Sequence, residues 1–451
     1  MEYKTYNMNN IINEINLTEQ QLKLLNDFDD GNNIFLTGPG GCGKSTIIKY
    51  MVKHAIEQSK KIQVCALTGC ASVLLNCKAK TIHSWAGIGL AKGDPLQIVR
   101  NVISNKYKKK NWLNIDILVI DEVSMMSKKI FEILDAIGKK VRKNKLPFGG
   151  IQLICSGDFF QLPPVGNIDD IDTNMFCFES ELWNNTFDIN YVLKDIFRQT
   201  DKKYTKILNE IRLGKLYRSS YNTLLECVNK KIDNELIKPT ILFPKRKDAV
   251  VINIRELNKL NTEEYIYNKS SHNVVLTLEE KEVNLKFNNN QKEHEIEYLK
   301  KNTIVDNKIV LKIGANVMCI TNIDKTDSNN RIVNGSKGII IDFKDELPLV
   351  KFNNGQTRLI DYHIWESENI PGIAIRQIPL IYSWAITIHK SQGISLENAI
   401  IDAGNNVFEC GQIYVALSRV KSLDGLYLIN FNPQKIKVNK KVLKFYNSLC
   451  E

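Results

Sequence analysis

The residues with the clearest chemistry lie in a glycine-rich turn, GPGGCGKS, at residues 38–45. This turn has the spacing GxxxxGK[ST] and lies between a strand expected at 33–38 and a helix expected at 44–58. In such a turn the backbone N–H groups point at phosphate oxygens, and the helix dipole favours an anion. Lys44 is expected to reach the β- and γ-phosphates of a nucleotide, and Ser45 to offer its hydroxyl to Mg²⁺. The expected contact residues are Gly38, Gly40, Gly41, Cys42, Gly43, Lys44, Ser45 and Thr46.

Two adjacent carboxylates supply the second part of that chemistry. Asp121 and Glu122 follow the apolar residues of the run DILVIDEVS at 116–124. Carboxylate oxygens are the ligands that Mg²⁺ prefers, so Asp121 is expected to hold the ion directly or through water. Glu122 is placed to activate the attacking water as a general base. An acidic pair alone is usually a solvated turn, but with the phosphate loop it predicts a P-loop nucleoside triphosphatase. That class includes kinases, GTPases, motors and helicases.

A parallel sheet is needed to hold these residues at one edge, and the sequence predicts such a sheet. Short apolar runs alternate with amphipathic stretches from Leu17 onward, which is typical of strands joined by helices. Strands are expected at 33–38, 61–69, 116–124 and 151–158, with helices at 44–58 and 127–145. Pieces of a second α/β unit are expected at 239–260, 382–393, 398–404 and 411–420.

The segment between those pieces has a different pattern. Residues 268–310 are rich in Asn, Lys and Glu, and we expect them to be partly loop or a poorly ordered insertion. Short apolar runs punctuated by Gly and Pro follow, which favours a small inserted β-barrel. The expected domains are 1–200, then 201–265 together with 380–451, and the insertion at 266–379.

Composition and charge limit the class of protein and its partners. The 61 Lys and Arg against 50 Asp and Glu give a formal net charge of +11 over 451 residues, which makes a polyanionic partner plausible. The group Cys65, Cys70 and Cys77 lacks the paired spacing of a zinc site, so we expect reduced, buried thiols. There is no signal-peptide core, no transit pattern and no apolar run of about 18 residues. We therefore expect a soluble, intracellular protein without membrane contact.

Five further motifs narrow the choice among P-loop proteins. They are TIHSWAGIG (81–89), GDFFQLPPV (157–165), FRQ (197–199), AITIHKSQG (385–393) and QIYVALSRV (412–420). The ordered set resembles helicase superfamily one, subgroup B, and within it the petite-integration-frequency (PIF) family of 5′→3′ DNA helicases. The segment KKVRKNKLPFGGIQLICSGDFFQLPPV resembles a signature region of the same family. The resemblance implies an α/β fold of two RecA-like parallel-sheet P-loop domains, with a small Src-homology-three-like β-barrel inserted in the second.

By matching position, the resemblance implies further roles around the nucleotide. Gln20 in LTEQ would recognise adenine, and Gln161 would couple the γ-phosphate to the DNA site. Arg198 and Arg419 would act as arginine fingers from the two sides of a cleft, because guanidinium stabilises charge on a transferred phosphoryl group. Gly393 would lie in a loop that contacts the nucleotide across the same cleft. A lone arginine is more often part of a surface ion pair, but the FRQ and ALSRV contexts favour the catalytic interpretation.

The same resemblance implies a track for single-stranded DNA on both domains. Hydroxyls and backbone amides suit phosphates, and aromatic faces suit unstacked bases. His83 and Trp85 have an alternative interpretation as packed core residues. A short strand-separating wedge is expected at about 86–112, whose run KYKKKNW (106–112) we expect to be a solvated face. The track residues are Thr68, His83, Ser84 and Trp85 in the first domain and Thr387, His389, Lys390 and Ser391 in the second.

Taken with the motifs, the resemblance implies a helicase that uses ATP and Mg²⁺, moves 5′→3′ on single-stranded DNA and unwinds duplex in replication, repair or recombination. Expected partners are single-stranded DNA and its junctions with duplex, and G-quadruplexes and RNA–DNA hybrids are further candidates. We expect a monomer in the nucleus or, for a viral protein, in the host cytoplasm. Two alternatives stay open. One is a single-stranded DNA translocase or protein-displacing ATPase with little unwinding, and the other is a catalytically inactive nucleic-acid-binding module.

Overall fold

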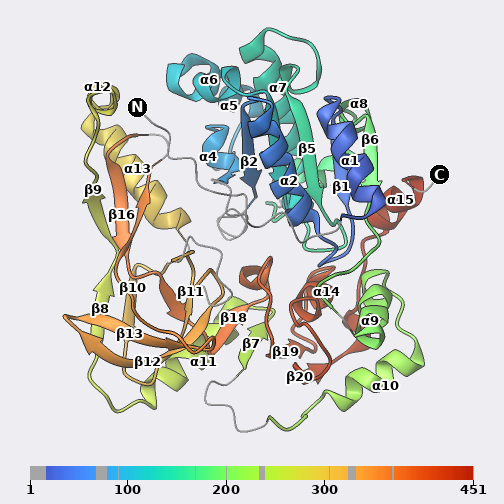
Figure 1. Cartoon of the computed structure of the whole chain (residues 1–451), viewed down its shortest axis with the longest axis vertical. Helices are drawn as coiled ribbons and strands as arrows, with labels where there is room; N and C mark the ends of the chain where they lie inside the picture. The colour runs from blue at the N-terminus through green and yellow to red at the C-terminus, as the bar shows by residue number, and fades with distance from the viewer. Residues whose placement is uncertain are drawn as a thin grey trace.

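Two parallel sheets, each packed with helices, lie one above the other in the computed structural model, and a set of inserted strands lies beside the lower sheet (Figure 1). The structure describes residues 17–67, 79–89, 91–167, 169–199, 201–232, 239–303, 305–323, 332–367 and 370–449.

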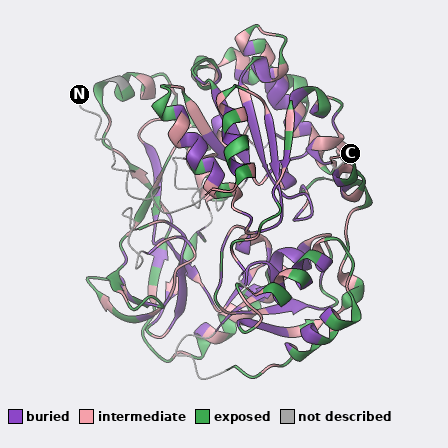
Figure 2. Cartoon of the chain, turned by 45° about the vertical axis from the view of Figure 1, so that its right-hand side comes forward, coloured by how far each residue is buried: buried purple, intermediate pink, exposed green. Residues whose placement is uncertain are grey.

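The first sheet has six strands in the order β3-β2-β4-β5-β1-β6, and all of its pairings are parallel. The strands are β1 (Ile34–Thr37), β2 (Ile62–Ala66), β3 (Lys80–Thr81), β4 (Ile117–Asp121), β5 (Gln152–Gly157) and β6 (Ile189–Val192). Helices cover both faces, which is why β1 and β4 are buried along their whole length (Figure 2). The predicted fold class is confirmed.

The longer helices of this first domain, such as α2 and α7, bury apolar residues on one side. They are α1 (Glu19–Asp29), α2 (Lys44–Glu57), α4 (Ile82–Trp85), α5 (Pro95–Ser104), α6 (Lys106–Leu113), α7 (Lys128–Arg142) and α8 (Trp183–Thr186). In α7, the Ser127 hydroxyl caps the helix by accepting from the backbone N–H of Ile130. Ile133, Leu134 and Ile137 are buried, and the helical spacing of three and four residues places them on one side of α7.

The second domain has a four-stranded parallel sheet in the order β18-β7-β19-β20. Its strands are β7 (Thr240–Phe243), β18 (Ala385–Thr387), β19 (Ala399–Ala403) and β20 (Leu426–Phe431). Helices α9 (Lys202–Arg212), α10 (Arg218–Glu226), α11 (Arg246–Asn258) and α14 (Gln412–Leu417) accompany it. One continuous apolar core includes residues of both domains, among them Leu153 of β5 and Ile401 of β19.

The insertion contains an antiparallel five-stranded sheet in the order β14-β13-β12-β11-β17. The strands are β11 (Asn316–Cys319), β12 (Lys337–Lys344), β13 (Leu347–Phe352), β14 (Thr357–Leu359) and β17 (Leu380–Tyr382). A two-stranded ribbon of β8 (Tyr265–Asn268) and β10 (Lys308–Leu311) accompanies it, and the two share one apolar core. A separate three-stranded sheet contains β9 (Ser270–Asn273), β15 (His363–Glu366) and β16 (Ile373–Gln377).

The expectation of a poorly ordered insertion at 268–310 is wrong, although loops join the elements of this segment as expected. This segment contains the strands β9 and β10 and two helices, α12 (Leu278–Asn284) and α13 (Asn289–Asn302). Capping boxes start both helices, at Thr277 with Glu280 and at Asn288 with Gln291. These caps satisfy backbone N–H groups that would otherwise lack partners, which lets rather polar sequences form helices.

The run KYKKKNW forms α6, and this helix is solvated in part: Lys106, Lys110 and Asn111 are exposed, whereas other residues of the run pack inward. Trp112 is completely buried, its ring lies 4.8 Å from that of Trp85, and its indole N–H donates to Ala86. The Lys108 ammonium donates to the carbonyl oxygen of Gly87 at 2.9 Å. The helix therefore braces the segment that follows α4, because an apolar residue and a lysine of the run both pack inward.

The last helix, α15 (Lys440–Ser448), packs on the first domain, although its position in the sequence predicts that it belongs with the second. The Phe445 ring stacks on that of Phe178 at 4.3 Å, and it also contacts Phe35 of β1. The Tyr446 hydroxyl lies 2.5 Å from the Thr37 hydroxyl oxygen. Figure 1 shows α15 beside β1 and β6, so the chain crosses between the domains twice.

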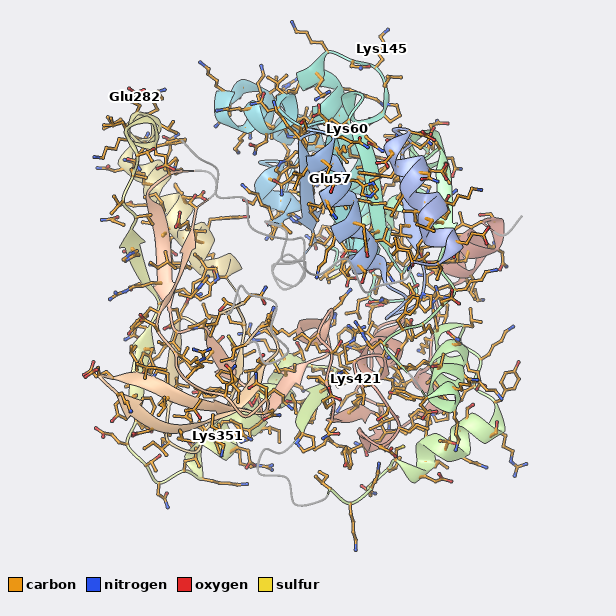
Figure 3. The ribbon with its side chains drawn as sticks, viewed as in Figure 1. Glu57, Lys60, Lys145, Glu282, Lys351 and Lys421 are labelled. Atoms are coloured by element: carbon orange, nitrogen blue, oxygen red, sulfur yellow. The ribbon has the colours of Figure 1, made fainter. Side chains whose placement is uncertain are left out.

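In the described part of the chain, no helix combines the length and apolarity that crossing a bilayer would need. Charged side chains project from both domains instead, and Figure 3 labels Lys60 and Lys145 on the first domain and Lys421 on the second.

Candidate functional site

The phosphate loop joins the carboxyl end of β1 to the N-terminus of α2. Gly43 is the N-cap of α2 with φ +88°, and Gly41 has φ +86°, a backbone region that glycine adopts freely. A Cβ on Gly41 would lie 2.5 Å from the Cβ of Arg198, so no side chain fits at this position. The local sequence thus makes a tight turn that opens onto the first backbone N–H groups of a helix.

Lys44 is held against the loop that carries it. Its ammonium donates to the carbonyl oxygens of Gly38 at 2.8 Å and Pro39 at 3.0 Å. An ammonium has three donors, so these two bonds fix the side chain over the turn, where nucleotide phosphates are expected. Ser45 and Thr46 follow in the first turn of α2.

The two predicted carboxylates lie at the end of β4, next to this loop. The pKa of Asp121 is raised to about 6, mainly by burial and in addition by the charge of Glu122, although the Lys44 ammonium acts in the opposite direction. Glu122 has φ +55°, which is unusual for a residue other than glycine. The Gln392 amide, from the second domain, donates to Glu122 Oε2 at 2.9 Å. The Glu122 side chain of the first domain is thereby held by a contact from the second.

Arg198 and Arg419 both adjoin the phosphate loop, as the resemblance implied. Arg198 Nη1 donates to the Ser418 carbonyl oxygen at 3.2 Å, and Arg419 Nη2 donates to the Ser418 hydroxyl at 2.9 Å. Burial lowers the pKa of both guanidinium groups, and the charge of Arg198 lowers that of Arg419 further, to about 10. Both stay charged at neutral pH. Two buried cations beside one phosphate loop favour an anion between them.

Three glutamines at the boundary between the two domains have free acceptor oxygens. The side-chain oxygens of Gln161, Gln199 and Gln392 are buried and accept no hydrogen bond from any residue that the structure describes. A Cβ on Gly411, the N-cap of α14, would lie 2.6 Å from the Gln161 carbonyl oxygen. Gln161 therefore lies where the first domain meets α14, a place from which a side chain can respond to movement of either domain.

A buried polar network ties the loop to both α14 and α15. Asp158 is completely buried and binds Arg212 of α9 through two bonds of 2.8 and 2.9 Å. The Tyr414 hydroxyl of α14 donates to Asp158 at 3.2 Å and accepts from the Gly40 backbone N–H at 2.8 Å. The Tyr446 hydroxyl of α15 donates to Asp158 at 3.3 Å. Burial lowers the pKa of Arg212, but Asp158, Tyr414 and Tyr446 together raise it by more, so the net shift is upward.

This network was missed from the sequence, and so was Gln21. The Gln20 amide donates to the Val192 carbonyl oxygen at 3.0 Å, at the end of β6. Gln21 is buried, and its amide nitrogen lies 3.3 Å from where a Cβ on Gly43 would be. The register of α1 decides which of the two adjacent glutamines faces the loop, and the capping box from Thr18 to Gln21 was the available signal.

The remaining predicted residues fall into three groups. Gly393 follows Gln392 with φ +81°, in the loop that contacts Glu122. Trp85 is buried, which fits its alternative interpretation as a packed core residue. Ser391 is also buried, and its hydroxyl donates to the Ile388 carbonyl oxygen. Thr68 lies outside the described residues. The track residues with partly exposed side chains are His83, Ser84, Thr387, His389 and Lys390.

Phosphate oxygens of the nucleotide would have to complete the coordination of a Mg²⁺ ion at this site. Among the described residues, no group of three or more His, Cys, Asp or Glu could hold a metal ion. Asp121 is a buried carboxylate next to the loop, and Ser45 is in the first turn of α2. One carboxylate, one hydroxyl and phosphate oxygens match the coordination that Mg²⁺ takes in phosphoryl-transfer sites, so these residues fit the ion.

Comparison with known proteins gives consistent matches along the chain. The profile of the PIF1-like helicase family matches residues 16–221, that of the DNA helicase Pif1 2B domain matches 296–343, and that of a family described as helicase matches 367–446. The ATP-dependent DNA helicase PIF1 of Xenopus laevis is 34% identical over 97% of this chain, and the human protein of that name is 32% identical over 96%. The chain spans 65% and 64% of the length of these two relatives.

Solved structures extend the similarity to the whole architecture. The Pif1 helicase from Candida albicans has a TM-score of 0.79 and 32% identity, covering 96% of this chain and 100% of that one. The Pif1 helicase from Bacteroides in complex with ADP-AlF3 and single-stranded DNA has a TM-score of 0.69 and 28% identity, covering 96% and 97%. With its motifs, its two parallel sheets and its insertion all matched, the chain belongs to the PIF1-like helicase family.

Proposed function

We propose that this chain is an ATP-dependent DNA helicase that moves 5′→3′ along single-stranded DNA and unwinds duplex. The observation that carries the proposal is the pair of buried guanidinium groups, Arg198 and Arg419, that adjoin one phosphate loop. A kinase or GTPase can work with one such domain, whereas this loop is completed by residues of a second. Relatives are named ATP-dependent DNA helicases, and the direction of movement is taken from the family resemblance.

The chain's own groups suggest how hydrolysis proceeds. Lys44 and the first N–H groups of α2 bind the phosphates of ATP, and Gln21 is placed to contact its base. Glu122, held by Gln392, accepts the proton of the attacking water. Arg198 and Arg419 stabilise the charge that develops on the transferred phosphoryl group. Mg²⁺, held by Asp121 and Ser45, supplies Lewis-acid stabilisation when bound.

Movement follows from the placement of Arg419 on the second domain. Its guanidinium gains an anionic partner when the domains close over ATP and loses that partner after product release, so the nucleotide favours one arrangement of the domains. Gln161, which adjoins α14, and the partly exposed Thr387, His389 and Lys390 are the groups through which this change reaches a bound strand. Alternating grip on the two domains then gives net translocation.

We propose junctions of single-stranded and duplex DNA as the working substrate, with G-quadruplexes and RNA–DNA hybrids as substrates to compare in the same assay. We further propose that the chain acts as a monomer in replication, repair or recombination, in the nucleus or, for a viral protein, in the host cytoplasm.

The direct biochemical test is ATP hydrolysis with and without single-stranded DNA. The wild-type protein is expected to hydrolyse ATP faster when an oligonucleotide is present. Lys44→Ala should abolish turnover, because the phosphates lose their main cation, and should leave DNA affinity largely unchanged. DNA-independent hydrolysis by the wild type, or robust hydrolysis by Lys44→Ala, would contradict the proposal.

A further inference from the structure

The last helix places a hydroxyl group against the start of the phosphate loop. This helix, α15, lies beyond the last of the helicase motifs, which ends at residue 420. Its Tyr446 is buried, and the hydroxyl oxygen lies 2.5 Å from the hydroxyl oxygen of Thr37, the last residue of β1. Gly38 follows directly, and its carbonyl oxygen accepts from the Lys44 ammonium at 2.8 Å. A shift of Thr37 would therefore reach Lys44 through the backbone of one residue.

The same hydroxyl contacts the segment that leads to Gln161. The backbone N–H of Phe159 donates to the Tyr446 hydroxyl at 3.2 Å, and this hydroxyl lies 3.3 Å from Asp158 Oδ1. The Tyr446 ring lies 4.6 Å from the ring of Phe160. The three residues that precede Gln161 thus contact one side chain of α15, and this side chain also contacts the residue that precedes the phosphate loop.

The direction of each hydrogen bond follows from which groups can donate. Asp158 pairs with Arg212 as a carboxylate, so it only accepts, and it takes the single proton of the Tyr446 hydroxyl. The backbone N–H of Phe159 only donates. The Thr37 hydroxyl therefore donates to Tyr446, which accepts two bonds and donates one. Burial raises the pKa of Tyr446, so the hydroxyl keeps its proton at neutral pH.

Aromatic packing holds α15 in place on the first domain. The residue before the tyrosine is Phe445, whose ring stacks on that of Phe178 at 4.3 Å and meets the Phe159 ring edge-on at 5.5 Å. The Lys441 ammonium of the same helix pairs with Glu179. A hydroxyl on a packed helix can fix the position of its partners more closely than one on a mobile segment.

We propose that Tyr446 is a positioning residue for the nucleotide, because its hydroxyl fixes the phosphate loop, through Thr37, relative to the segment that carries Gln161. It acts through Thr37 rather than by contact with the nucleotide. The inference rests on the proposed function, because the loop that Tyr446 positions is the one that binds ATP. It adds that the C-terminal helix, which lies outside the motifs, is part of the ATP site.

Nucleotide affinity tests this role when the hydroxyl alone is removed. Tyr446→Phe keeps the ring that packs on Phe160 and removes the hydrogen bonds of the hydroxyl. It is expected to raise the KM for ATP and the inhibition constant of ADP by the same factor, about three to five, in line with the loss of one hydrogen bond. The kcat should change less, because a displaced loop weakens the binding of ground state and transition state alike. Assays well below the unfolding midpoint separate this effect from a loss of stability.

A matched control removes a tyrosine hydroxyl in the inserted barrel. The Tyr382 hydroxyl of β17 accepts from the Val310 N–H at 3.3 Å and donates to the Val310 carbonyl oxygen at 2.5 Å. Tyr382→Phe therefore also breaks hydrogen bonds of a tyrosine, but none that involves the phosphate loop. It should leave the KM for ATP and the inhibition constant of ADP unchanged.

A double-variant cycle tests the path through Thr37. Thr37→Val removes the donor and should raise both constants as Tyr446→Phe does. The double variant should be no weaker in nucleotide binding than Tyr446→Phe alone, because both changes remove the same bond. Thr37→Ser keeps a hydroxyl at this position and should bind nucleotide nearly as the wild type does.

Three outcomes would overturn the inference while the wild type hydrolyses ATP. The first is that Tyr446→Phe leaves both constants unchanged or lowers only kcat. The second is that Tyr382→Phe raises the constants as much as Tyr446→Phe. The third is that the effects of Thr37→Val and Tyr446→Phe add in the double variant. If the wild type hydrolyses no ATP, the proposed function fails, and binding of a fluorescent ADP analogue to the same variants still tests the contact between Tyr446 and Thr37.

Discussion

Replacing Arg212 by methionine would leave the Asp158 carboxylate buried without its ion-pair partner. Asp158 is 0% exposed and the Arg212 side chain 12% exposed, and two charge-assisted hydrogen bonds of 2.8 and 2.9 Å join them. Methionine keeps much of the apolar stem that packs on the Phe160 ring, which lies 4.4 Å from the guanidinium carbon. The substitution therefore removes mainly the charge and its hydrogen bonds.

The expected loss in the free energy of unfolding follows from the burial of this ion pair. Breaking a buried pair by removing one partner costs about 3–5 kcal/mol, because the remaining charge is uncompensated. The matched control is Lys421→Met, which removes the pair between Lys421 and Glu397, whose side chains are 46% and 74% exposed. Such exposed pairs contribute about 0–1 kcal/mol. The double variant Asp158→Asn with Arg212→Met should recover part of the loss, because no unpaired charge is then buried.

Thermal unfolding followed by circular dichroism measures these differences. The midpoint for Arg212→Met is expected to fall by about 3–5 °C relative to the wild type, and that for Lys421→Met by about 1 °C at most. Equal midpoints for the two single variants would refute the reasoning, as would a double variant less stable than Arg212→Met. In either case the network would not be the tie between the domains that its geometry indicates.

Three further predictions concern the nucleotide site. Glu122→Gln should bind ATP with near wild-type affinity and hydrolyse it at least 100-fold more slowly, because the general base is lost; single-turnover kinetics would show this, and hydrolysis near the wild-type rate would contradict it. Tyr414→Phe should raise the KM for ATP several-fold and change kcat less, because the Gly40 N–H loses its partner while Glu122 and the arginines stay in place; an unchanged KM would count against this role of Tyr414. Without Mg²⁺, wild-type stability should fall by about 3 kcal/mol at most as pH rises from about 4 to about 6. The pKa of Asp121 is raised to about 6, so the folded chain holds a proton that the unfolded chain releases in this range. Asp121→Asn should flatten this dependence of stability on pH in thermal scans. If the wild type and Asp121→Asn gave the same pH profile, the raised pKa of Asp121 would be contradicted.

The first sheet was predictable because its strands are buried on both faces. Parallel strands covered by helices consist of continuous apolar residues, such as ILVID in β4, and these runs are visible without any tertiary information. The phosphate loop and the acidic pair follow such strands directly, so sequence position alone placed Lys44, Asp121 and Glu122 at one edge of the sheet. Local motifs thus predict the parts of the site that are built locally.

The insertion shows where the reasoning from hydrophobic pattern fails. Helices α12 and α13 have few apolar residues, so their composition suggested a loop. Their start signals were nevertheless present at Thr277 with Glu280 and at Asn288 with Gln291, since a capping box is a local feature. Greater weight on caps and less on polarity would have found both helices.

The Asp158 network could not be predicted from the sequence. Its members are separated by 54 to 288 residues, and nothing local links a tyrosine in α15 to a carboxylate in the first domain. The same holds for Tyr446 and Thr37, whose hydroxyls meet although 409 residues separate them. Contacts of this kind depend on tertiary packing, so they need the structure.

Strand displacement on tailed duplexes tests the central claim most directly. The substrates are one duplex with a 5′ single-stranded tail and the same duplex with a 3′ tail, each incubated with ATP and Mg²⁺. The account predicts displacement of the strand from the 5′-tailed duplex, little from the 3′-tailed one, and none by Lys44→Ala. Displacement from neither duplex, although single-stranded DNA stimulates ATP hydrolysis, would contradict the helicase claim and leave a translocase. Displacement only from the 3′-tailed duplex would contradict the direction.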